Sequence, residues 1–123
     1  MTKEAAIQRF FNQFLPAYEE NTVPYEWAEM PYITYNVVTG NILSGEIPFS
    51  CSVWYRDNSW TEINKKTREI TDKIGLGGVK LKCDSGAIWL KTGTPDAQSM
   101  GDANDDMIRR KYINITAEFL TAD

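Results

Sequence analysis

The sequence predicts an α+β protein, with a mostly antiparallel sheet of about five strands and two helices packed on one face. Two patterns in neighbouring segments lead to this prediction. Residues 46–56 alternate apolar and polar side chains, as half-buried strands do, and residues 60–74 repeat apolar side chains every three to four positions, as amphipathic helices do. A sheet with one apolar face, followed directly by a helix with one apolar stripe, favours packing of the helix on that face.

The chain of 123 residues is expected to form a single domain, 1–123. Its composition, 42% hydrophobic and 24% charged, is typical of a globular protein. Its net charge of −4 argues against nucleic-acid binding, which needs a basic surface. The first residues do not resemble a signal peptide, and no apolar run is long enough to span a membrane. We therefore expect an intracellular protein with no membrane partner.

The N-terminal third is predicted to hold one helix and one long loop. Residues 3–15 carry apolar side chains at helical spacing, Thr2 can cap the first turn, and Pro16 ends the helix. Three phenylalanines on this helix are expected in the core, with a partner groove as the alternative. The loop 16–31 is acidic and aromatic, and we expect it either to cover the edge of the core or to form a contact surface.

Two antiparallel hairpins are predicted within the sheet-and-helix body, residues 32–120. The first hairpin joins a strand at 32–39 to the strand that begins at residue 46. The second lies within 79–90, and the last strand is predicted at 107–120.

The second helix carries clear end signals. Ser59 and Glu62 have the spacing of a capping box, in which each side chain bonds the other residue's backbone N–H. Gly75 is placed to adopt the left-handed conformation that closes a helix. Residues 92–106, rich in polar residues and glycine, are predicted to form a loop.

The sequence indicates no catalytic or metal centre. Without histidine, Ser-His-Asp and Cys-His nucleophile systems are excluded. Cys51 and Cys83 lie on the apolar side of predicted strands and are interpreted as reduced core thiols. Asp102, Asn104 and Asp106 match the start of a calcium loop, but apolar residues stand where the loop needs glycine and glutamate. We therefore predict no enzyme, no cofactor and no metal, and favour a solvated acidic loop.

Three aromatic residues on separate strands have the parity that points away from the predicted core: Trp54, Trp89 and Tyr112. Aromatic side chains that gather on one face can form a patch of the size that marks an interface. The alternative is that the N-terminal helix covers them. We hypothesise that they form a contact surface together with residues of the polar loop, namely Met100, Asp102, Asp105 and Asp106.

Two stretches carry a family resemblance. Pro31-Tyr32-Ile33-Thr34-Tyr35 follows a helix and a proline-containing loop, and a long closing stretch spans Met100 to Leu120. In both respects the chain resembles the small tail-terminator (tail-completion) and head–tail joining proteins of long-tailed phages and prophages. The similarity covers most of the chain as an order of elements with a few signature positions.

The resemblance implies a structural virion protein that forms a ring, commonly of six subunits. Such a ring caps the tail tube and joins it to the head, so its partners would be copies of itself, tail-tube proteins and head-connector proteins. DNA would be passing cargo, not a specific ligand. The implied location is the virion, and the host cytoplasm during assembly. Neck and head-closure proteins share this size and element order, so the position within the virion stays open. The alternative is a monomeric or dimeric domain that binds a small ligand or regulates a partner.

Overall fold

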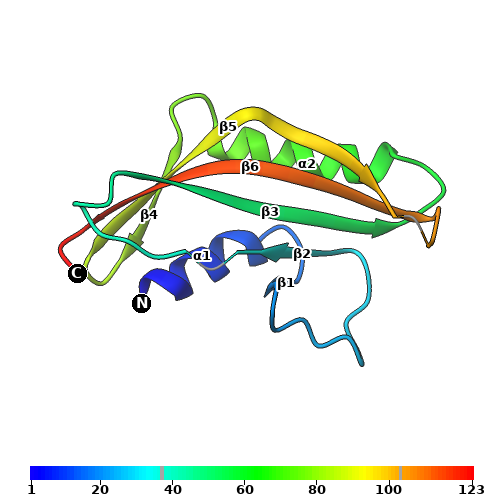
Figure 1. Ribbon diagram of the computed structural model, residues 1–123, viewed down its shortest axis with the longest axis horizontal. Coiled ribbons are helices and arrows are strands. Elements are labelled where there is room, and N and C mark those ends of the chain that lie inside the picture. Colours follow the sequence, from blue (N-terminus) through cyan, green and yellow to red (C-terminus); the bar gives the residue numbers. More distant parts are fainter. Residues whose placement is uncertain (37, 103) are drawn as a thin grey trace.

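The computed structural model describes residues 1–36, 38–102 and 104–123 as an α+β fold with one mixed sheet (Figure 1). Six strands lie in the order β1-β2-β3-β6-β5-β4, one more than expected. Among the strands of the described residues, only the β1–β2 pair is parallel, and the other four pairs are antiparallel. The elements are α1 (Lys3–Asn12), β1 (Ala17–Glu19), β2 (Tyr32–Tyr35), β3 (Glu46–Arg56), α2 (Thr61–Ile74), β4 (Val79–Cys83), β5 (Gly86–Gly101) and β6 (Ile108–Thr121).

Both helices pack on the same face of the sheet. From α1, the Phe11 ring lies 5.2 Å from the Tyr35 ring and 5.8 Å from the Phe49 ring. Next to α2, the Trp60 ring lies 5.3 Å from Arg109. Odd-numbered residues of β2, β3 and β6 therefore point toward the helices, because side chains alternate along a strand. We call the opposite side, which carries the even-numbered residues of these strands, the outer face.

The core lies between the helices and the inner face of the sheet. α1 contacts both β1 and β4, the two edge strands, so the sheet curls around this helix. The amphipathic spacing of α1 buries Ile7, Phe10 and Phe11 against the sheet. The Ala5 N–H donates to the Thr2 hydroxyl at 3.1 Å, which confirms the predicted cap. Helical structure ends at Asn12, three residues before the predicted end.

The loop predicted at 92–106 is wrong for most of its length, because residues 92–101 continue β5. β6 is long and keeps an alternating pattern, so it offers β5 a partner along its whole length. A bulge between Thr92 and Ala97 lets the ladder pass Pro95, which has no N–H to donate. Of the predicted loop, only the residues after β5 connect two strands, and residue 103 lies outside the described chain.

The first predicted strand and loop also need correction. Residues 17–19 of the predicted loop form β1, and β2 ends at Tyr35 instead of residue 39. Residue 37 of that predicted segment lies outside the described chain. The hairpin pairing itself is confirmed, since β2 runs antiparallel to β3 with Tyr35 opposite Cys51.

The predicted capping box on α2 is wrong, because the helix begins at Thr61, one residue later than a Ser59 cap requires. Trp60 occupies the N-cap and makes no side-chain cap bond. The Ser59 hydroxyl still accepts a hydrogen bond from the Thr61 N–H at 3.1 Å, so it supports the turn that leads into the helix. At the other end Gly75 follows α2 with a positive φ of +73°, but its ψ of 176° lies outside the predicted left-handed helical conformation. Its N–H donates to the Thr71 carbonyl at 2.9 Å.

Candidate interaction surface

An arginine flanked by two aromatic rings forms the centre of the outer face. The Arg110 guanidinium carbon lies 4.8 Å from the Trp54 ring and 5.6 Å from the Tyr112 ring. Its Nε donates to the Ser52 hydroxyl at 3.0 Å, and the Trp54 indole N–H donates to the Thr34 hydroxyl at 2.9 Å. Each cation–π contact of this kind contributes about 0.5–2 kcal/mol.

The strand register builds this cluster. Trp54 lies opposite Arg110, and Ser52 lies opposite Tyr112, on the paired strands β3 and β6. Met100 of β5 lies opposite Arg110 on its other side. Across residues 1–36, 38–102 and 104–123, no carboxylate forms an ion pair with Arg110, so its guanidinium keeps hydrogen-bonding capacity for a partner.

Trp89 lies on the same face but in a second cluster. Its ring lies 4.2 Å from the Lys91 ammonium and 5.3 Å from the Lys80 ammonium, and its indole N–H donates to the Gly77 carbonyl at 3.0 Å. Trp89 lies opposite Glu118, six residues along β6 from Tyr112, which corresponds to about 20 Å. The three predicted aromatics thus share a face without forming one cluster, and α1 does not cover them because it packs on the other side.

Lys91 links the Trp89 cluster to two carboxylates. It pairs with Glu46 and lies 3.8 Å from the Glu118 carboxylate. The hydrogen bond that the Lys91 ammonium donates to the Glu46 carboxylate raises the pKa of Lys91. Lys91, Glu46 and Glu118 at this end of the outer face therefore already pair with one another, unlike Arg110.

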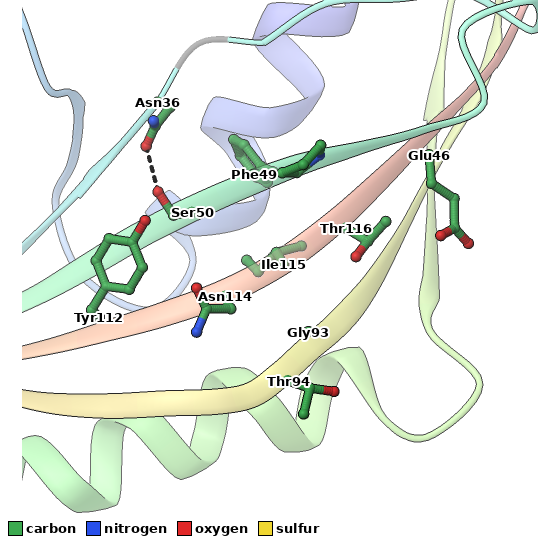
Figure 2. Close-up of a pocket in the computed structure, with 11 residues that line it drawn as sticks. Asn36, Glu46, Phe49, Ser50, Gly93, Thr94, Tyr112, Asn114, Ile115 and Thr116 are labelled. Carbon is green, nitrogen blue, oxygen red and sulfur yellow. Dashed lines mark hydrogen bonds between the residues drawn. The ribbon is translucent and has the colours of Figure 1, made fainter.

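A polar groove runs along the outer face beside Tyr112 (Figure 2). Its volume is about 420 Å³, and its walls come from β3, β6, the bulge of β5 and the segment after β2. The Ser50 hydroxyl donates to the Asn36 amide oxygen at 2.7 Å across one wall. The lining includes Glu46, Ser50, Gly93, Thr94, Asn114 and Thr116, so it offers hydroxyls and amides without a titratable pair arranged for catalysis.

The predicted acidic residues lie at the end of the sheet beyond Met100. Asp105 forms an ion pair with Arg56 at 2.9 Å and accepts the Met107 N–H at 2.9 Å. Asp102 accepts the Asn104 N–H at 2.8 Å, and Asp106 is exposed. The carboxylates of Asp102 and Asp105 thus bond the backbone of the segment between β5 and β6. Within the described residues, no group of three potential ligand side chains could hold a metal ion.

The two cysteines are free, and they differ in burial. Cys51 is buried as predicted, whereas Cys83 is only half-buried because it ends an edge strand. Cys51 lies opposite Ile113, while Gly86, the neighbour of Cys83, lies opposite Thr121. The two thiols are therefore separated by most of the length of β6.

Burial raises the pKa of the Cys51 thiol far above its ordinary value of 9.0. A raised folded-state pKa contributes stability that is fully present below the unfolded pKa and is lost as the pH rises above it. For Cys51 alone, we expect the free energy of unfolding to fall by about 1.4 kcal/mol between pH 8 and pH 10. Urea denaturation of wild type, Cys51→Ala and Cys83→Ala at both pH values measures this. The loss should shrink in Cys51→Ala and persist in Cys83→Ala, and an identical loss in all three proteins would contradict the assignment.

Sequence reasoning missed Arg110, Ser52 and Thr34, which hold the two aromatic rings in place. The available signal was parity, because Arg110 and Tyr112 share a face of β6 and Ser52 and Trp54 share the same face of β3.

A scan against protein-family models and searches of curated proteins and of solved structures returned no match to this chain. Neither described helix is long and apolar enough to cross a membrane.

Proposed function

We propose that this chain is a non-enzymatic structural protein of a phage or prophage, a tail terminator that forms a ring, caps the tail tube and joins it to the head. The observation that carries the proposal is the outer face. Both helices pack on one side of the sheet and leave the Trp54–Arg110–Tyr112 cluster uncovered. Tryptophan, tyrosine and arginine are the residues most enriched at interface hot spots. The element order and the Pro31–Tyr35 segment supply the phage context.

The charge of the chain agrees with this role. A ring around a DNA conduit has to let phosphates slide past without binding them, and a protein of net charge −4 repels phosphate at long range. A cyclic ring also requires that one surface of each subunit meets a different surface of the next. Tail-tube and head-connector proteins would then contact surfaces that the ring leaves free.

The proposal predicts self-association that depends on the outer face. We expect the wild type to form concentration-dependent oligomers in light-scattering mass measurements, with rings visible in negative-stain images. Trp54→Ala and Trp89→Ala remove two half-buried aromatic side chains from this face, so the combined variant should associate at least ten-fold more weakly. Leu76→Ala, at a fully exposed loop position, is the matched control. Unchanged assembly of the combined variant would rule out these aromatics as the interface.

A monomeric or dimeric ligand-binding domain is the second candidate, favoured by the polar groove of about 420 Å³. Thermal-shift screening against small polar compounds tests it. A strict monomer that a compound stabilises, with the effect lost in Asn114→Ala, would favour this candidate over the ring.

A further inference from the structure

Acidic and basic residues are segregated along the chain. Residues 10–55 contain no lysine or arginine, and their acidic residues are Glu19, Glu20, Glu26, Glu29 and Glu46. Residues 65–91 are rich in bases, namely Lys65, Lys66, Arg68, Lys73, Lys80, Lys82 and Lys91, with only Glu69, Asp72 and Asp84 as acids. Because β1 and β4 are the two edges of the sheet, this segregation gives the edges opposite charge.

The acidic edge carries a projecting aromatic loop, residues 20–31, between β1 and β2. Tyr25 and Trp27 are 74% and 69% exposed, and Glu26 and Glu29 are exposed beside them. The loop is held in shape, since the Trp27 and Ala28 amides both donate to the Pro24 carbonyl, at 3.0 and 2.8 Å. Exposed aromatic side chains on an ordered loop are typical anchors of protein interfaces.

The basic edge carries a groove of complementary character between α1 and β4. Its volume is about 470 Å³, within the range of sites that hold an aromatic group. Ala6, Phe10 and Leu81 supply apolar surface, and Arg9, Lys80 and Lys82 also line the groove, with the Lys80 ammonium 5.3 Å from the Trp89 ring on the outer side of β4. In the described part of the chain, neither these bases nor Glu26 and Glu29 take part in an ion pair.

The loop is too far from the groove of its own chain to occupy it. The loop leads into Tyr32, which lies opposite Trp54 of β3. Strand pairing through β5 and β6 places the start of β4 level with Ile47 of β3. Ile47 is seven residues, or about 23 Å, from Trp54 along β3. Figure 1 shows β4 at the left of the molecule and the 20–31 loop apart from it, below β2 and to the right. Any contact between the two surfaces is therefore between molecules.

We infer that the 20–31 loop of one copy docks in the α1–β4 groove of a second copy. Tyr25 and Trp27 enter the groove, while Glu26 and Glu29 pair with Lys80, Lys82 and Arg9. The contact joins two different surfaces, so repetition gives a closed ring or an open chain. The inference rests on the self-association in the proposed function and adds a second contact between copies, at the edges of the sheet, to the outer-face contact proposed above.

Charge reversal tests this pairing. One variant carries Lys80→Glu with Lys82→Glu, and the other carries Glu26→Lys with Glu29→Lys. Each alone places like charges at every contact, so we expect self-association to weaken at least ten-fold in light-scattering mass measurements. An equimolar mixture restores opposite charges at every contact, so it should assemble as the wild type does. A chain with all four substitutions should also assemble.

The matched control is Lys65→Glu with Arg68→Glu, the same charge change on the exposed side of α2, which should leave assembly unchanged. Circular dichroism verifies that each variant is folded. Carbodiimide joins lysines to carboxylates in direct contact, so cross-linked wild type should yield peptides that join the 20–31 loop to β4. If the charge-reversal variants assemble as strongly as the wild type, or if their mixture fails to assemble, the docking inference alone is overturned. A wild type that stays monomeric and yields no such peptide would contradict the proposed function as well.

Discussion

Replacing Phe11 with alanine is expected to lower the free energy of unfolding by about 3–5 kcal/mol. The Phe11 side chain is fully buried and lies at the centre of the packing between α1 and the sheet. Its ring stacks on Tyr35 at 5.2 Å and contacts Phe49 and Phe10 at 5.8 and 5.2 Å. The substitution leaves a cavity between two rigid layers, where the surrounding side chains have little freedom to close it.

Urea denaturation followed by circular dichroism measures this loss. Leu76→Ala is the control, because its side chain is fully exposed and the free energy of unfolding should change by less than about 0.5 kcal/mol. A loss below about 1 kcal/mol for Phe11→Ala would mean that α1 is not anchored through this ring.

The position of α1 links stability to the proposed contacts. This helix packs against both edge strands and forms one wall of the groove that we assign to the 20–31 loop of a second copy. Loosening α1 would therefore change the groove without changing its charges. The outer face has no helix to support it, and Arg110, Trp54 and Tyr112 hold one another there instead.

Much of the fold could be predicted from local patterns. Apolar spacing at 60–74 and at 3–15 predicts the two helices, and their packing on one face followed from the alternation in β3. The same alternation placed Trp54, Trp89 and Tyr112 on one face, since parity alone decides which side of a sheet a residue occupies. These features depend on residues that are close in the sequence, so they could be predicted from it.

Features that depend on pairing between strands far apart in the sequence could not be predicted in this way. β6 lies between β3 and β5, and no local sequence pattern predicts that strand order. The polar residues 92–101 form a strand because β6 supplies a partner there, so pairing overrides composition. Arg110 meets Trp54 only through the β3–β6 register, and the separation of Trp89 from Tyr112 has the same origin.

Substituting Gly86 with alanine is expected to lower the free energy of unfolding by about 3 kcal/mol, because this glycine begins β5 where it lies against the end of β6. Gly86 has φ +147°, which side-chain-bearing residues rarely adopt, and an added Cβ would lie 2.1 Å from the Leu120 carbonyl oxygen. That oxygen belongs to the backbone, so relief requires β5 and β6 to move apart where Gly86 pairs with Thr121. Gly77→Ala is the control, since no atom lies within 4 Å of its added Cβ, and its free energy of unfolding should change by less than about 0.5 kcal/mol in the same urea titration. Equal stability of the two variants would show that β5 and β6 can move apart here without loss of stability. The expected difference would mean that the β5–β6 pairing is rigid. Because this pairing positions Trp89 and the β4 edge, a rigid pairing can present a defined groove.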